Sequence, residues 1–266
     1  MSEANPRMDE DLQSNDEPVR RWTLLLLPLC ATIALLLVAI VGWRARHLTT
    51  GKPITVYAAA GLRQPLESAA TDFTSESGRP IEFIWGGTGT LYGQLKLTGR
   101  GDLFIAADAY TPDLAVREDL LQHPTPIALQ RLVIITAPGN PKGVATLADL
   151  SRDDIRLALA DPEQAAVGRA TVSAYALVQL PMPQAQDAKA TVGDVALAVQ
   201  TGAADAGLVW HHVAASWPGV EEVAKLEFTE PIVMAVVARD DADAAFGDWL
   251  RVNGERYFSA AGLESP

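Results

Sequence analysis

Apolar and polar positions divide the chain into an N-terminal stretch and a longer region with a repeating pattern. Residues 1–22 are polar and acidic, which predicts a tail without a packed core. Residues 23–43 contain no charge. At about 1.5 Å per residue such a run reaches about 30 Å, the thickness of one bilayer core. Residues 44–52 form a short linker. The pattern therefore predicts one N-terminal transmembrane anchor ahead of the main part of the chain.

A cleaved signal peptide is the alternative interpretation of the apolar run. Signal peptides have apolar regions of about 7–15 residues and end at a small-residue cleavage site. The run at 23–43 is longer, and the sequence Trp43-Arg44-Ala45-Arg46 at its end is a poor cleavage site. We therefore favour an anchor that is retained.

From residue 53 onward, short apolar runs alternate with stretches of helical periodicity. Residues 53–59 have the pattern of a buried strand. Leu62, Leu66 and Phe73 then repeat at helical spacing until Gly78, a typical C-terminal glycine. Such alternation is typical of an α/β fold with mainly parallel sheet. Further strands are predicted at 81–85, 103–106, 131–137, 155–160, 206–210 and 232–238, and further helices at 91–97, 167–180, 192–199 and 246–250.

Charge and cysteine content exclude several classes of function. The chain has 33 acidic and 21 basic residues, a formal net charge of −12, whereas broad nucleic-acid binding needs Lys and Arg to replace counterions. Cys30 is the only cysteine in the sequence, which excludes a disulfide framework and a multi-cysteine metal site. The sequence has neither a Gly-x-Ser-x-Gly elbow nor a Walker phosphate loop, so nothing in the pattern supports an enzyme.

A few titratable residues are candidates for chemistry, but structural roles explain them better. Asp102 and Asp108 flank a predicted strand, and we expect their carboxylates to accept hydrogen bonds from backbone N–H groups of the adjoining loops. His211 and His212 are adjacent, and adjacent side chains point in different directions on most backbones. We therefore expect these histidines at the surface or at a cleft rim rather than in a metal site.

Small or polar residues gather where predicted strands pass into helices, at 58–61, 86–90, 165–168 and 190–192. A helix start presents unpaired N–H groups and a partial positive charge. Ligands of α/β sheets bind beyond the carboxyl ends of the strands. Several such helix starts converging on one cleft would form an anion site without Lys or Arg. Tight packing at strand-to-helix turns is the alternative explanation.

Five stretches of the sequence together resemble the periplasmic molybdate-binding proteins of ABC importers. The resemblance runs from about residue 54 to 258, nearly all of the predicted soluble part. It implies the two-lobed type II periplasmic-binding fold, with 53–129 and 229–266 in lobe I and 130–228 in lobe II. The stretches are ITVYAAAGL (54–62), ESGRPIEFIWGGTGTLYGQLKLTGRGDLFIAAD (76–108), RLVIITAPGNP (131–141), LALADPEQAAVGR (157–169) and TVGDVALAVQTGAADAGLVW (191–210).

The resemblance also implies which residues hold the ligand. Family members bind a tetrahedral dianion with hydroxyls and backbone N–H groups, at positions that fall on Gly61, Thr88, Val167, Val192 and Trp210. Gly61 replaces a serine and keeps only its N–H. Trp210 replaces a tyrosine and offers an indole donor without an acceptor. A shell made of donors alone suits a fully deprotonated oxyanion and is expected to reject protonated phosphate or arsenate.

The function implied by the resemblance is a membrane-anchored, extracytoplasmic solute-binding protein that delivers molybdate or tungstate to the permease of an ABC importer. It implies no catalysis, no resident metal or cofactor and no nucleic-acid partner. It also implies a monomer with its soluble part on the periplasmic side, and the apolar run at 23–43 predicts attachment to the cell (inner) membrane. The replacements at Gly61 and Trp210 leave a second interpretation open: a sensor or interaction module that kept the fold and changed or lost its ligand.

Overall fold

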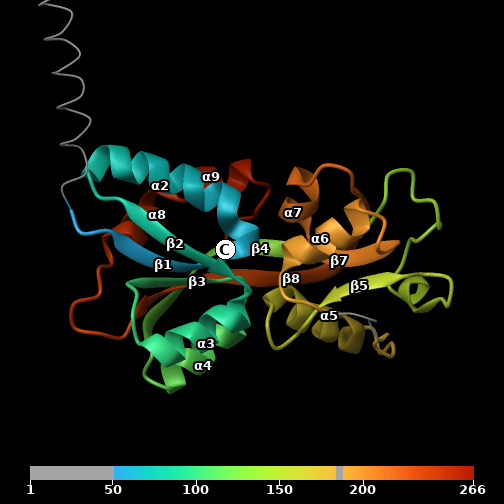
Figure 1. The fold of residues 1–266 in the computed structure, drawn as a ribbon, viewed down its shortest axis with the longest axis horizontal. Coiled ribbons are helices and arrows are strands. Elements are labelled where there is room, and N and C mark those ends of the chain that lie inside the picture. The colour runs from blue at the N-terminus through green and yellow to red at the C-terminus, as the bar shows by residue number, and fades with distance from the viewer. Residues whose placement is uncertain (1–50, 184–187) are drawn as a thin grey trace, which may run out of the picture. The chain divides into compact units, whose positions relative to one another are not determined.

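The computed structural model describes residues 51–183 and 188–266 (Figure 1). Residues Gly51–Pro266 form one compact unit, which contains everything described below. The predicted tail, the predicted anchor at 23–43 and nearly all of the linker lie outside the described residues, so the anchor stays a prediction. Within the two described ranges, no helix combines the length and the apolar character that crossing a membrane requires.

The first lobe has a small parallel sheet with helices on both faces. Strand β1 lies between β2 and β3 and runs parallel to both. Figure 1 shows α2 and α9 on one side of this sheet and α3 and α4 on the other. The elements are β1 (Ile54–Ala59), η1 (Ala60–Leu62), α2 (Arg63–Ser77), β2 (Ile81–Gly86), α3 (Thr88–Thr98), β3 (Leu103–Ala106), α4 (Tyr110–Arg117), α8 (Ala245–Asn253) and α9 (Glu255–Ala260).

Helix α2 shows how local sequence sets this lobe. Its apolar positions Leu66, Ala69 and Phe73 are buried, because spacings of three and four residues place them on one helical face. Gly78 ends the helix in the left-handed conformation at φ 71, and its N–H donates to Thr74 O. Glycine adopts this conformation without a Cβ penalty. The predicted helix and its glycine end are confirmed.

The second lobe repeats the arrangement with shorter strands. Strand β5 pairs in parallel with β6 and β7, and α5 lies on the opposite side of the sheet from α6 and α7 (Figure 1). Strand β7 passes directly into α7, since the helix begins at the next residue. The elements are η2 (Ala148–Ser151), β5 (Leu157–Ala160), α5 (Ala166–Leu177), β6 (Ala188–Lys189), α6 (Val192–Gln200), β7 (Ala206–Trp210) and α7 (His211–Ser216).

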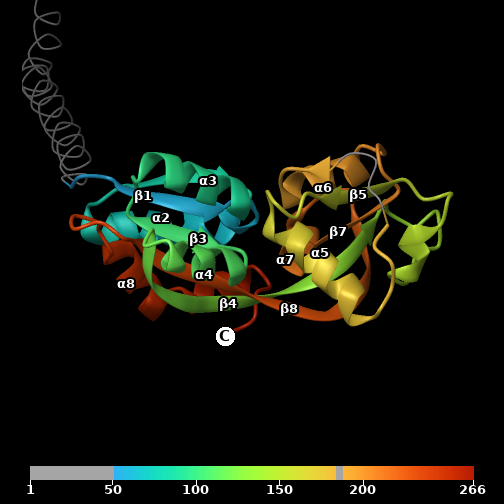
Figure 2. The ribbon, with the colours of Figure 1, turned by 90° about the horizontal axis from the view of Figure 1, so that it is seen from below.

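Two long antiparallel strands, β4 (Leu121–Thr136) and β8 (Glu221–Val237), connect the lobes (Figure 2). Strand β8 pairs with β3 in the first lobe, and β4 pairs with β7 in the second, both antiparallel. The resulting order is β2-β1-β3-β8-β4-β7-β5-β6. The two-lobed α/β fold is thus confirmed, and the lobe limits 53–129, 229–266 and 130–228 stay a prediction.

The prediction of mainly parallel sheet was wrong for these connecting strands. The sequence pattern indicated only 131–137 and 232–238, which overlap the C-terminal ends of much longer strands. The pairing of β4 with β8 contains register shifts, for example between Gln122 and Thr125 and between Arg131 and Val133. Such irregularities bend and twist a strand, so one continuous pair of strands can serve both lobes.

Candidate functional site

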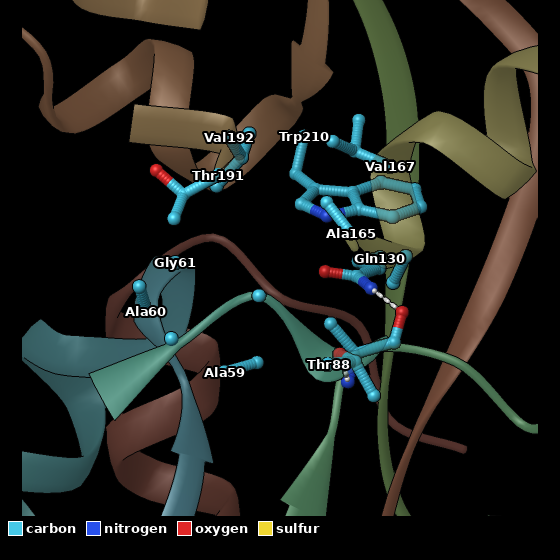
Figure 3. A pocket seen from close by; sticks show the side chains of 14 residues that line it. Ala59, Ala60, Gly61, Thr88, Gln130, Ala165, Val167, Thr191, Val192 and Trp210 are labelled. Carbon is cyan, nitrogen blue, oxygen red and sulfur yellow. Dashed lines mark hydrogen bonds between the residues drawn. The ribbon is translucent and has the colours of Figure 1, made fainter. Parts of the chain in front are cut away.

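A small cavity lies between the lobes, where several helices begin (Figure 3). The cavity has a volume of about 20 Å³, and all fourteen residues that line it are uncharged. In the described part of the chain, no group of His, Cys, Asp and Glu is arranged to hold a metal ion. The lining residues are Ala59, Ala60, Gly61, Gly86, Gly87, Thr88, Ala107, Gln130, Ala165, Ala166, Val167, Thr191, Val192 and Trp210.

All five residues predicted to bind the ligand line this cavity. Gly61 and Thr88 come from the first lobe, and Val167, Val192 and Trp210 come from the second. The structure thus brings together residues that lie far apart in the sequence, and their role in binding an oxyanion stays a prediction. The sequence analysis missed the lining residue Gln130, because a single glutamine within a strand belongs to no motif.

Gly61 brings its backbone close to the second lobe. A Cβ at this position would lie 3.0 Å from Cγ1 of Val192 and 3.4 Å from Cγ2 of Val213. A side chain would therefore have to displace neighbours across the cavity, whereas glycine fits with its N–H available. This close fit is a physical reason for a glycine at a position where the resembling family has a serine.

Thr88 places a hydroxyl at the start of α3. Its side chain is 1 % exposed, and Oγ1 accepts a hydrogen bond from the backbone N–H of Ala107 at 3.2 Å. Because the N–H of Ala107 can only donate, the hydroxyl proton of Thr88 is directed elsewhere. Thr88 can therefore donate to a ligand in the cavity.

Val167 and Val192 each present a backbone N–H in the first turn of a helix. Val167 is the second residue of α5 and Val192 is the first residue of α6, so neither N–H has an acceptor within its own helix. Thr191 caps α6: its Oγ1 accepts from the N–H of Asp194, and the Asp194 carboxylate accepts from the N–H of Thr191. This capping box fixes the start of α6 and hence the direction of the Val192 N–H.

We expect Thr191→Ala to lower the free energy of unfolding by about 1 kcal/mol, the usual effect of losing an N-cap hydroxyl. The melting temperature should fall by about 2–4 °C for a chain of this size. Thermal unfolding of the full-length chain, followed by circular dichroism, measures the change. Thr201→Ala is the matched control, because the Thr201 hydroxyl bonds only to carbonyls of its own helix. Equal effects of the two variants would contradict a capping role.

Trp210 forms one wall of the cavity from the end of β7. The residue is 2 % exposed, and its backbone is held opposite Leu132 of β4. Figure 3 shows the indole nitrogen on the ring edge that faces the cavity, on the side of Gln130. An indole nitrogen can only donate, so this side chain presents a donor to a ligand.

Backbone hydrogen bonds join the lobes next to the cavity. The N–H groups of Gly89 and Thr90, in the first turn of α3, donate to Gln164 O at 2.9 and 3.3 Å. A Cβ at Gly87 would lie 2.4 Å from Gln164 O, and one at Gly89 would lie 1.8 Å from Glu163 O. These two glycines therefore allow the second lobe to approach α3. The predicted glycine-rich turn at 86–90 is a contact between lobes.

An ion pair also joins the lobes. Asp108 is 2 % exposed, and its Oδ2 accepts from Nη2 of Arg169, which belongs to α5, at 2.6 Å. Its Oδ1 accepts from the N–H of Thr111 at 2.7 Å; this donor lies in the first turn of α4 rather than in a loop. Glu230 of β8 lies nearby and accepts from the N–H of Ala109, and burial raises the pKa of its carboxyl group.

Asp102 also accepts hydrogen bonds from backbone N–H groups, one in a loop, as predicted, and one in strand β1. Its Oδ2 accepts from the N–H of Thr55 at 2.8 Å, and its Oδ1 accepts from the N–H of Asp243 at 3.1 Å. These bonds fix the turn before β3 against the start of β1 and the segment that precedes α8. Asp102 therefore has a structural role within the first lobe.

His212 is buried behind the cavity, so the prediction of a surface or rim position was wrong for this residue. It is 3 % exposed, and its Nε2 lies 3.1 Å from Gly61 O. Because a carbonyl only accepts, Nε2 carries the proton, and the buried Nδ1 has no partner among the described residues. Burial lowers the pKa of His212 to about 4, with a smaller contribution from His211; the bond to Gly61 acts in the opposite direction.

Comparison with known proteins identifies relatives along most of the described chain. The model of the family described as bacterial extracellular solute-binding protein matches residues 54–251. The molybdate-binding protein ModA of Mycobacterium tuberculosis is 32% identical over 163 residues, which are 60% of this chain. The matched stretch spans 61% of the length of that curated relative.

Solved structures share the fold at low sequence identity. The periplasmic molybdate-binding protein of Azotobacter vinelandii has a TM-score of 0.62 and 19% identity, with 80% of this chain and 99% of that chain covered. The sulfate-binding protein SubI of Mycobacterium tuberculosis has a TM-score of 0.70 and 16% identity, with 81% and 87% covered. Likeness at this identity shows the fold alone.

Proposed function

The chain belongs to the bacterial extracellular solute-binding protein family, and we propose that it binds a tetrahedral oxyanion, molybdate or tungstate, between its two lobes. The family consists of binding proteins rather than enzymes. The observation that carries the proposal is a small uncharged cavity at which helix starts from both lobes meet. The anion is the cargo, so no resident cofactor enters the proposal.

The size of the cavity favours a compact ligand. Its space of about 20 Å³ exceeds the roughly 10–15 Å³ that one water needs. It is far below the roughly 300–1,000 Å³ of pockets for organic ligands. A single small inorganic ion matches this size, whereas a sugar phosphate does not.

The lining chemistry favours an anion held by neutral donors. Candidate donors are the backbone N–H groups of Gly61, Val167 and Val192, the hydroxyl of Thr88 and the indole N–H of Trp210. A hydrogen bond to a charged group contributes about 1.5–3 kcal/mol, and the positive ends of α5 and α6 add to the attraction. Closure of the lobes removes water and so strengthens each of these interactions.

We further propose that the protein works outside the cytoplasm as a monomer and delivers its anion to an ABC importer permease. The 32% identical relative carries the name molybdate-binding protein, which supports molybdate as the cargo. Tungstate has the same charge and nearly the same size, so this site should barely separate the two. Anchoring through residues 23–43 would hold the protein near the importer and raise its effective concentration there.

We expect molybdate and tungstate to raise the melting temperature of the full-length chain by about 8–16 °C. Ligand at 1,000 times its dissociation constant stabilises a folded protein by about 4 kcal/mol, and each kcal/mol corresponds to about 2–4 °C at this size. Differential scanning fluorimetry with the chain in detergent measures the shift, with chloride at equal ionic strength as the control.

A folded chain that shows no shift with any tetrahedral oxyanion would contradict the proposal. That result would favour a sensor or interaction module that kept the fold and lost the ligand, the interpretation left open by Gly61 and Trp210.

A further inference from the structure

Gln130, in the connecting strand β4, brings an unpaired hydrogen-bond acceptor to the cavity. The residue is 2 % exposed and lines the cavity. Its Nε2 donates to Ala107 O at 2.7 Å, while its buried Oε1 has no partner among the described residues. Figure 3 shows this oxygen directed toward the centre of the lining residues. Buried polar atoms are nearly always paired, so this oxygen indicates a missing donor.

The chemistry of Ala107 fixes the orientation of the Gln130 amide. A carbonyl oxygen only accepts, so the amide atom that faces Ala107 O must be the nitrogen, and the oxygen must face the cavity. The N–H of the same residue donates to Oγ1 of Thr88. Ala107 therefore leaves the Thr88 hydroxyl free to donate to a ligand and the Gln130 Oε1 free to accept from one. The sequence predicted a shell of donors alone, whereas the cavity also contains this one acceptor.

A fully deprotonated oxyanion has no proton for this acceptor. It would place an anionic oxygen in the same small cavity as an unpaired amide oxygen, which costs binding energy. A bridging water would satisfy both oxygens, but a cavity of about 20 Å³ is too small for a tetrahedral anion and a water that needs roughly 10–15 Å³. A singly protonated oxyanion supplies the donor directly.

We propose that Gln130 determines which protonation state of an oxyanion this cavity prefers, with its Oε1 accepting a hydrogen bond from an O–H of the ligand. The ligand class extends to singly protonated tetrahedral oxyanions, of which hydrogen phosphate and hydrogen arsenate are the common members. This inference rests on the proposed oxyanion site and refines its specificity.

Two pairs of anions test the proposal, because the members of each pair differ mainly by one proton. Hydrogen phosphate and sulfate have the same charge and similar size, as do hydrogen arsenate and selenate. We expect the full-length wild-type chain, measured by isothermal titration calorimetry at pH 8, to bind the protonated member of each pair at least as tightly as the member without a proton. Gln130→Met, which keeps the length and removes the acceptor, should lower the ratio of phosphate to sulfate affinity by about 10-fold to 100-fold.

Thr88→Val is the matched control, because it removes a donor that is held by the same peptide. It should weaken both members of each pair equally and leave their ratio unchanged. If Gln130→Met fails to fold, the wild-type chain still tests the proposal through its affinity ratios of phosphate to sulfate and of arsenate to selenate. Binding of molybdate or sulfate without phosphate or arsenate, or a ratio that stays within twofold in Gln130→Met, would overturn the role of Gln130 and leave the oxyanion site intact. Binding of no oxyanion at all would overturn both proposals.

Discussion

Replacing Gly89 with alanine is expected to weaken oxyanion binding by about 100-fold while each lobe stays folded. The new Cβ would lie 1.8 Å from Glu163 O and 2.9 Å from the carbonyl carbon of the same residue. Backbone atoms cannot rotate away as a flexible side chain can, so the lobes must move apart. Closure would then lose the bonds from Gly89 and Thr90 to Gln164 O, each worth about 1 kcal/mol.

Gly93→Ala is the matched control because Gly93 lies in the same helix. A Cβ there meets nothing within 4 Å, and alanine in a helix is more favourable than glycine by about 1 kcal/mol. Isothermal titration of both full-length variants with molybdate, together with far-ultraviolet circular dichroism, separates closure from folding. Equal affinities in the two variants would show that the approach of Glu163 to α3 does not belong to the ligand-bound form.

The sequence predicted those parts of the fold that depend on local patterns. Helix α2 was predicted because Leu66, Ala69 and Phe73 recur at helical spacing. Its end was predicted because Gly78 can adopt the left-handed conformation that ends a helix without help from any distant residue. The outer parts of β4 and β8 were missed because they connect the lobes and expose many side chains. Around Gln122 the sequence shows no apolar alternation. Residues 225–229 of β8 do alternate, with Leu226 and Phe228 half-buried between exposed neighbours, and the sequence analysis overlooked this pattern.

The candidate site was predicted as a set of positions but not as a mechanism of closure. Gly61, Thr88 and Trp210, which the resemblance predicts as ligand-binding residues, line one cavity. The resemblance could not indicate Gln130, whose importance depends on Ala107, 23 residues away. Gly89 was likewise predicted only as part of a turn, since the need for glycine comes from a backbone carbonyl of the other lobe. Contacts of this kind exist only after both lobes have formed.

The free energy of unfolding is expected to fall by up to about 3 kcal/mol between pH 6.5 and pH 4 because of His212. Burial lowers the pKa of His212 from 6.5 to about 4 in the folded chain. Above pH 6.5 the imidazole is neutral in both states and contributes nothing to the pH dependence. Between these two values the unfolded chain binds a proton that the folded chain does not bind, so acid favours unfolding. Below pH 4 both states are protonated and the effect levels off.

Urea unfolding of the full-length chain at pH 7 and pH 4 tests this assignment. His212→Gln keeps a donor for Gly61 O but cannot titrate, so its loss of stability between the two pH values should be about 3 kcal/mol smaller than that of the wild type. His123→Gln is the control, because His123 is exposed, and it should behave like the wild type. An unchanged pH dependence in His212→Gln would contradict the assignment.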